Sequence, residues 1–335
     1  MRTLSTILLS TLLVLAACTA PEASETAAPA AETTPRLDWA IAIHGGAGVI
    51  PKTMEEEKKQ AYFDGLEQAL TLGRDLLAEG AEALDVVEQV IHVFEDSPLF
   101  NAGKGAVFTH DGKNELEAAI MDGRDLSCGA VSGVTTVKYP ISLARKVMTD
   151  SRHVFFMREG AERFADEMGL ERVEPEYFFV QRRWDALQKA LAEEEEQAED
   201  KHGTVGCAVL DRAGNLAAGT STGGLTNKRF GRVSDVPVIG AGTYANNRTV
   251  AISCTGWGEK FIRHTVAYDV SALMEYKGLS VEEAARIVIH EKLDPGDGGL
   301  VAVAHNGDIA LAFNSAGMFR GAANSAGRFD VAIWE

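Results

Sequence analysis

The 335-residue sequence has little of what metal sites, disulfide scaffolds and nucleic-acid surfaces require. Its four cysteines are widely spaced and an odd number follows Cys18, so neither a zinc site nor a disulfide framework is indicated. The eight histidines show no HxxxH spacing, and the GxSxG motif of serine hydrolases is absent. Only 32 basic side chains accompany 49 acidic ones, a net charge of −17. Because nucleic-acid binding needs clustered cations, we expect no nucleic-acid partner.

Long apolar runs are also scarce, and the N-terminal one, Thr3 to Ala17, is too short to span a bilayer. After the basic Arg2 it fits an export signal. The small residues before Cys18 look like a bacterial lipobox, which predicts a lipoprotein signal over residues 1–18 and lipidation of Cys18; an ordinary signal peptide is the alternative. Residues 19–36 have the composition of a disordered tether. We therefore expect an exported periplasmic or cell-envelope lipoprotein that meets a membrane only through its lipid anchor.

The rest of the sequence alternates helix and strand patterns, which predicts an α+β domain. Before residue 200 we expect a strand at 39–43 that ends at His44-Gly45-Gly46-Ala47-Gly48, helices at 55–79 and 83–95, a hairpin around Asp111-Gly112 and a strand at 130–137. After it we expect strands at 205–211, 216–222 and 249–255, helices at 262–276 and 281–293, and a hairpin turning at Asn306-Gly307. This pattern favours sheets packed between helix layers.

The negative charge is unevenly distributed along the chain. Residues 37–203 carry a net charge of −15, whereas residues 204–335 carry only −1. The acidic excess includes a run between Glu193 and Asp200, a pattern typical of a solvated stretch. Directly after it, His202-Gly203-Thr204-Val205-Gly206 leads into a buried-strand pattern. The charge distribution therefore divides the chain near the Gly203–Thr204 bond.

A second unusual stretch is rich in glycine and threonine. It contains Ser221-Thr222-Gly223-Gly224, then Gly231-Arg232-Val233-Ser234-Asp235, and ends at Gly240-Ala241-Gly242. So much Gly and Thr around one Arg and one Asp is unusual for a plain loop. On these residues alone, however, a structural loop and a binding site remain open alternatives.

Taken together, the motifs resemble the plant-type (type 2) L-asparaginase and isoaspartyl peptidase family of N-terminal-nucleophile hydrolases. The resemblance runs from about Trp39 to about Arg320. In the family's order, its motifs are His44-Gly45-Gly46-Ala47-Gly48, Pro98-Leu99-Phe100-Asn101-Ala102-Gly103, Met121-Asp122-Gly123, His202-Gly203-Thr204-Val205-Gly206, Thr220-Ser221-Thr222-Gly223-Gly224, Gly231-Arg232-Val233 and Cys254-Thr255-Gly256. The family fold implies a four-layer αββα sandwich, with residues 37–335 as a single domain.

The resemblance implies that the chain cuts itself between Gly203 and Thr204, which gives an α fragment of residues 37–203 and a β fragment of residues 204–335. The Thr204 hydroxyl would attack the Gly203 carbonyl, form an ester and be released by hydrolysis. Its freed amino group would then act as the base for its own hydroxyl, because an α-amine has a reference pKa of about 7.7–8.0. In the family pattern Thr222 tunes this nucleophile and Asn101 supports it.

Substrate-binding roles follow from the same resemblance. Arg232 would bind the substrate α-carboxylate, Asp235 would bind the α-ammonium, and Thr255 with Gly256 would form the oxyanion hole. The expected activity is that of a Thr-nucleophile amidohydrolase acting on β-aspartyl dipeptides and L-asparagine. A glycosylasparaginase, which removes glycans from asparagine, is the alternative, and a non-catalytic amino-acid-binding lipoprotein is a more remote one.

The family requires no cofactor, although a backbone loop in it binds Na⁺. Carbonyl oxygens suit such a hard cation, and the matching loop here consists of Phe94, Glu95, Ser97, Phe100, Ala102 and Lys104. Each cleaved protomer would be an αβ pair, and the resemblance implies a dimer of these units.

Overall fold

The computed structural model describes residues 36–193 and 203–335. The expected signal, the lipidation residue Cys18 and nearly all of the expected tether lie outside the described residues, as does most of the acidic run before Gly203. None of the helices in the described part of the chain is long and apolar enough to cross a membrane.

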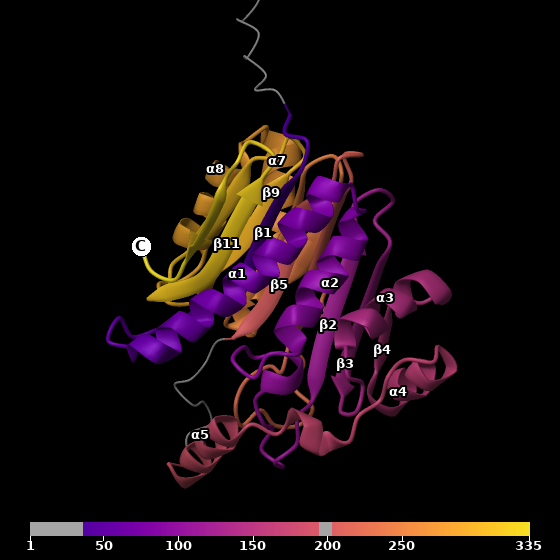
Figure 1. The fold of residues 1–335 in the computed structure, drawn as a ribbon, viewed down its shortest axis with the longest axis vertical. Coiled ribbons are helices and arrows are strands. Elements are labelled where there is room, and N and C mark those ends of the chain that lie inside the picture. The colour runs from indigo at the N-terminus through magenta and orange to yellow at the C-terminus, as the bar shows by residue number, and fades with distance from the viewer. Residues whose placement is uncertain (1–35, 194–202) are drawn as a thin grey trace, which may run out of the picture. The chain divides into compact units, whose positions relative to one another are not determined.

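Two β-sheets lie at the centre of the domain (Figure 1). The larger has the strand order β12-β11-β1-β5-β6-β2-β3-β4 and the smaller the order β10-β9-β8-β7. The strands of the larger sheet are β1 (Ala40–Gly48), β2 (Leu116–Asp122), β3 (Cys128–Val134), β4 (Phe155–Met157), β5 (Thr204–Leu210), β6 (Leu216–Thr222), β11 (Gly317–Asn324) and β12 (Phe329–Ala332). Those of the smaller sheet are β7 (Thr243–Ala245), β8 (Val250–Gly256), β9 (Gly298–Ala304) and β10 (Ile309–Phe313).

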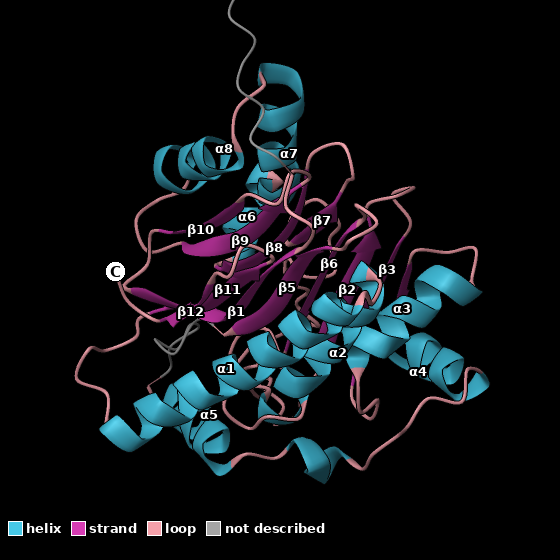
Figure 2. Cartoon of the chain, turned by 45° about the horizontal axis from the view of Figure 1, so that its top comes forward, coloured by secondary structure: helices cyan, strands magenta, loops and turns pink. Residues whose placement is uncertain are grey.

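Helices cover the outer face of each sheet, so the layers are α, β, β and α (Figure 2). The larger sheet carries α1 (Glu56–Glu79), α2 (Ala83–Glu95) and α3 (Pro140–Asp150), and the smaller carries α6 (Gly258–His264), α7 (Val266–Lys277) and α8 (Val281–Ile287). The remaining helical segments are α4 (Arg158–Glu167), α5 (Gln181–Ala192) and the short turns η1 (Gly103–Gly105), η2 (Pro175–Phe178) and η3 (Val288–Lys292). The expected α+β layered sandwich is therefore confirmed.

The two faces of β1, a central strand of the larger sheet, carry side chains of different size. On β1, Ile41 and Ile43 join the core under the helices, whereas Ala40 and Ala42 face the core shared with the smaller sheet. Successive side chains of a strand point to opposite faces, so this alternation places large residues against helices and small ones between the sheets. Near one end of β5 and β6 the inward positions become polar, and the candidate site begins there.

Two sequence-based expectations in the first half of the chain are wrong. The strand that was expected to end at His44 continues to Gly48 through a bulge between His44 and Gly46. The expected hairpin at Asp111-Gly112 forms only as a turn. The carbonyls of Ala106 and Val107 bind the Asn114 amide at 3.0 and 3.1 Å, so residues 106–108 pair with no strand there.

Candidate active site

Thr204 and Thr222 lie directly opposite each other on neighbouring strands. They are register partners of the antiparallel pair β5 and β6, so both side chains point to the same face of the sheet. The Thr204 hydroxyl donates a hydrogen bond to Thr222 Oγ1 at 3.2 Å, and that oxygen also accepts from the Gly224 N–H at 3.0 Å. Both threonines are buried. The structure thus brings the expected nucleophile and the residue expected to tune it into direct contact.

The peptide bond before Thr204 is closely packed by the bulge of β1. A Cβ on Gly46 would lie 2.8 Å from Gly203 Cα, and a Cβ on Gly203 would lie 2.8 Å from the Asn101 Cβ. Asn101 itself is fixed, because its Nδ2 donates to the Gly224 carbonyl at 2.8 Å and its Oδ1 accepts from the Val107 N–H at 2.9 Å. Gly203 has no left-handed φ, so its glycine is needed here for close packing. Asn101 lies where a supporting residue is expected.

His44 is part of the site although its role was not predicted. It is fully buried, and its Nδ1 lies 3.0 Å from the Thr204 carbonyl oxygen, which can only accept. Burial lowers the pKa of this imidazole to about 3, so the ring is neutral and Nδ1 carries the hydrogen. Nε2 then accepts from the Ser253 hydroxyl at 2.8 Å. His44 therefore holds the backbone of Thr204 and ties β5 to the smaller sheet.

A chain of hydroxyl groups continues from this histidine between the two sheets. Ser253 lies 2.7 Å from Thr220 Oγ1, and Thr220 in turn accepts from the Thr243 hydroxyl at 2.7 Å. All three side chains are fully buried. Because buried polar groups are costly unless paired, this network fixes the register of β6 against β7 and β8.

The residues expected to form the oxyanion hole end β8. Thr255 Oγ1 accepts from the Ala47 N–H of β1 at 3.2 Å, which leaves its own hydroxyl hydrogen available to donate. Gly256 follows with a φ of +154°, and a Cβ there would lie 2.1 Å from the Asp297 carbonyl oxygen. β1 thus contacts both expected parts of the machinery, Thr204 through His44 and Thr255 through Ala47.

Arg232 and Asp235 lie next to each other in the segment between β6 and β7. The Arg232 Nη2 and the Asp235 Oδ1 lie 2.7 and 2.8 Å from the position that a Cβ would take on Gly258. Arg232 makes a two-point contact with Glu259 of α6, with Nε–Oε1 at 2.9 Å and Nη2–Oε2 at 3.0 Å. A substrate carboxylate would therefore have to compete with Glu259 for the guanidinium.

Asp235 is the only acidic residue between β6 and β7. Its carboxyl is buried, and among the described residues its Oδ2 has no hydrogen-bond partner. Burial raises the pKa of Asp235 to about 7, although the positive charge of Arg232 opposes this shift. A buried carboxylate oxygen without a donor suits a cationic ligand such as an α-ammonium group.

A further acid that was not predicted, Glu117 of β2, fixes the segment that carries these two charges. Its Oε2 accepts from both the N–H (3.0 Å) and the hydroxyl of Ser234, and its Oε1 accepts from the Ser132 hydroxyl at 2.8 Å. Glu117 is almost completely buried. Since Ser234 precedes Asp235 directly, Glu117 holds the backbone from which the expected substrate-binding charges project.

The expected cation loop follows α2. The carbonyl oxygens of Phe100 and Ser97 would lie 1.9 and 2.9 Å from a Cβ on Gly105, so both lie close to this glycine, and neighbouring backbone carbonyls are ligands that suit a hard cation. The ammonium of Lys104 lies 5.4 Å from the ring centre of Tyr177, so this side chain is engaged outside the loop. The described residues contain no cluster of three or more His, Cys, Asp or Glu side chains suited to a metal.

The Glu95 side chain of this loop points into the layer between α2 and β6. It accepts from the Ser221 hydroxyl at 2.6 Å and the Ile141 N–H at 3.2 Å, and its second oxygen has no partner among the described residues. Burial raises the pKa of Glu95 to about 8.

Thr204 begins a central strand of an αββα sandwich, and buried polar side chains surround it between the two sheets. This arrangement defines the class of N-terminal-nucleophile hydrolases. Comparison with known proteins gives the family. A sequence model described as asparaginase matches residues 37–333. The chain therefore belongs to this asparaginase family.

Named relatives agree with this assignment. The chain is 50% identical over 292 residues to the isoaspartyl peptidase of Salmonella typhimurium, covering 84% of this chain and 93% of the relative. It is 47% identical over 327 residues to a probable isoaspartyl peptidase/L-asparaginase 2 of Arabidopsis thaliana, covering 89% and 99%. It is 41% identical over 292 residues to the plant-type L-asparaginase of Pyrococcus furiosus, covering 82% and 93%.

Proposed function

We propose that this protein is an isoaspartyl peptidase and L-asparaginase whose nucleophile is Thr204. The contact between the Thr204 hydroxyl and Thr222, next to the closely packed Gly203–Thr204 bond, carries this proposal. Its family membership and the names of its relatives support the same activity.

The first reaction is cleavage of the chain itself. The Thr204 hydroxyl oxygen attacks the Gly203 carbonyl carbon, the C–N bond breaks, and the acyl group moves to the oxygen as an ester. Water then hydrolyses the ester, which leaves a carboxylate on Gly203 and a free amino group on Thr204. The ladder of β5 and the His44 contact keep Thr204 in place during this step.

The second reaction is amide hydrolysis. The Thr204 amine takes the proton of its own hydroxyl, and the oxygen attacks the β-carbonyl of the substrate. Thr255 and Gly256 stabilise the oxyanion, while Arg232 and Asp235 hold the α-carboxylate and α-ammonium. The leaving amine takes the proton from Thr204, and water hydrolyses the β-aspartyl ester to aspartate.

The test uses a denaturing gel and three assays. The wild type is expected as two fragments, Thr204→Ala as one uncut chain, and Thr204→Ser, which keeps a hydroxyl, as a cleaved control. Ammonia from L-asparagine, aspartate from β-Asp-Leu and sugar from GlcNAc-Asn are then measured. A wild type that stays uncut refutes the mechanism and favours amino-acid binding without catalysis. Sugar release alone favours glycosylasparaginase.

We also propose the remaining features that the family resemblance implies. The protein would be exported and anchored through Cys18, it would bind Na⁺ at the backbone loop of residues 94–104, and two αβ units would form a dimer. The carbonyl oxygens of Ser97 and Phe100, which both lie close to Gly105, support the cation site. Mass spectrometry of the N-terminal peptide tests for the lipid on Cys18. The melting temperature in Na⁺, compared with that in choline, tests the cation site, and the molecular mass in solution tests the dimer.

A further inference from the structure

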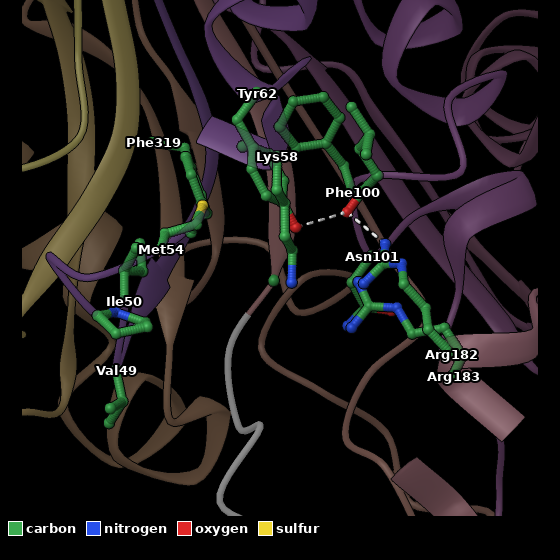
Figure 3. Close-up of a pocket in the computed structure, with 14 residues that line it drawn as sticks. Val49, Ile50, Met54, Lys58, Tyr62, Phe100, Asn101, Arg182, Arg183 and Phe319 are labelled. Carbon is green, nitrogen blue, oxygen red and sulfur yellow. Dashed lines mark hydrogen bonds between the residues drawn. The ribbon is translucent and has the colours of Figure 1, made fainter. Parts of the chain in front are cut away.

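Among the residues that the structure describes, a cavity beside Gly203 is lined by three basic side chains and by no acidic one. Figure 3 shows Lys58 of α1 on one side of this cavity and Arg182 and Arg183 of α5 on the other, with Asn101 between them. Acidic residues outnumber basic ones in the whole sequence by 49 to 32. The charged side chains described around this cavity are therefore all positive, a local feature that suits an anion.

The three cations differ in how firmly they are held. Arg182 Nη2 donates to the Leu99 carbonyl at 2.7 Å, and Arg183 Nε donates to the Gly105 carbonyl at 3.0 Å. Lys58 is exposed and makes no hydrogen bond or ion pair with any other described residue. Its neighbour Lys59 pairs with Glu56 at 3.2 Å. Lys58 thus lines the cavity with an ammonium that is unpaired among the described residues, next to arginines that are held by backbone carbonyls.

Apart from Asn101, the other side chains that line the cavity are apolar or aromatic. Tyr62 stacks on Phe319 with ring centres 4.3 Å apart, and Phe100 meets Tyr62 edge-on at 5.6 Å. Ile50 and Met54 also line this side. The cavity therefore offers an apolar surface and a positive rim within one space, which matches an amino acid with an apolar side chain and a free carboxylate.

The chemistry of the proposed reaction places the leaving group on this side of Thr204. The Thr204 amine must give its proton to the leaving nitrogen, so the two nitrogens have to come within hydrogen-bond reach. In the uncut chain the Thr204 nitrogen is bonded to Gly203, and Gly203 lines the cavity. Arg232 and Asp235, which would hold the aspartyl part of the substrate, do not line it.

We propose that this cavity is the leaving-group subsite for β-aspartyl dipeptides, in which Lys58 and Arg182 bind the α-carboxylate of the departing amino acid. The inference rests on the proposed function and deepens it. When the β-amide C–N bond breaks, the departing amino acid takes the proton from Thr204 and leaves as a zwitterion whose carboxylate the cavity holds. Asparagine releases only ammonia, which has no carboxylate for these cations, so the cavity favours dipeptides over asparagine.

The experiment compares Lys58→Met with the wild type on three substrates: β-Asp-Leu, its C-terminal amide and L-asparagine. Loss of one charge-assisted contact is expected to raise KM for β-Asp-Leu about tenfold with little change in kcat. The ratio of kcat/KM for β-Asp-Leu to that for L-asparagine falls by the same factor, and so does the wild-type preference for the acid over the amide, because Arg182 still contacts the carboxylate. Lys58→Arg restores the KM.

Lys59→Met is the matched control, because it removes the same charge one residue away on the same helix. It is expected to behave as the wild type on all three substrates. An unchanged KM for β-Asp-Leu in Lys58→Met, or an equal loss on the acid and its amide, overturns the subsite. A wild type that cleaves neither β-Asp-Leu nor asparagine overturns the proposed function instead, and this result needs no variant.

Discussion

Replacing Glu117 by Gln is expected to weaken substrate binding while leaving the chemical step intact. Glu117 is the cross-strand neighbour of Thr222 but makes no hydrogen bond to it. It accepts two hydrogen bonds from Ser234, the residue directly before Asp235. A Gln oxygen can take the place of Oε2, and its NH₂ group can donate to the Ser132 hydroxyl. The substitution therefore keeps the geometry and removes only the charge.

The size of the effect follows from these two contacts. Hydrogen bonds to a charged group contribute about 1.5–3 kcal/mol, and neutral ones roughly half as much. Two such bonds to Ser234 lose about 2 kcal/mol together, which corresponds to roughly a 30-fold change in an equilibrium constant. Because Ser234 anchors the segment of Arg232 and Asp235, we expect most of this loss as a higher KM. Glu117→Ala should lose more, because it also leaves the Ser234 N–H buried without a partner.

The assay is steady-state hydrolysis of β-Asp-Leu, with melting temperature measured in parallel. Glu117→Gln should raise KM by one order of magnitude or more and change kcat less than threefold. Glu115→Gln, which removes the same charge from a half-buried side chain two residues away, should match the wild type within about twofold. A Glu117→Gln enzyme with lower melting temperature but unchanged KM would refute the positioning role, and so would a loss confined to kcat.

Two further predictions concern pH. Burial lowers the pKa of His44 from 6.5 to about 3. Between these two pH values the imidazole is therefore protonated in the unfolded chain and neutral in the folded chain. Denaturant titrations should show wild-type stability falling about 1.4 kcal/mol per pH unit from this group between pH 6.5 and 3, and His44→Gln should lose that slope; equal slopes would contradict the assignment. Burial raises the pKa of Asp235 from 3.8 to about 7, and only its ionised form attracts an α-ammonium. The inhibition constant of L-aspartate as a competitive inhibitor should therefore rise about tenfold per pH unit below pH 7. Asp235→Asn should show no such pH dependence, and a wild-type inhibition constant that is equally independent of pH would contradict the prediction.

Local sequence patterns predict the secondary structure correctly where an element pairs with a segment that is close to it in the sequence. The hairpin of β5 and β6 was predicted within one residue at each end, because a Gly-Asn turn separates two runs of strand formers. The expected helix at 262–276 is instead two helices, α6 and α7, divided at Thr265 with a φ of 49°. A β-branched residue rarely adopts this conformation, so nothing in the sequence pattern indicated the break.

The site residues divide in the same way: those in local motifs are predicted from the sequence, and those defined by long-range contacts are not. Thr204, Thr222, Arg232 and Asp235 belong to short motifs, and the structure brings them into one region. His44 was seen only as part of a motif, because its partners lie 160 and 209 residues away. Glu117 is one of 49 acidic residues, and only the pairing of β2 with β6 shows why it is special.

The strand order explains how a cut domain could stay intact. Residues 37–203 supply β1, β2, β3 and β4, and residues 204–335 supply all other strands. Along the larger sheet, β12 and β11 are followed by β1, then by β5 and β6, and then by β2, β3 and β4, so the two fragments alternate. Separating them would break the ladders of β1 with β11 and β5, and of β2 with β6. Because β5 lies between β1 and β6, a new N-terminus at Thr204 would remain fixed on both sides, as a nucleophile that acts with its own amine requires.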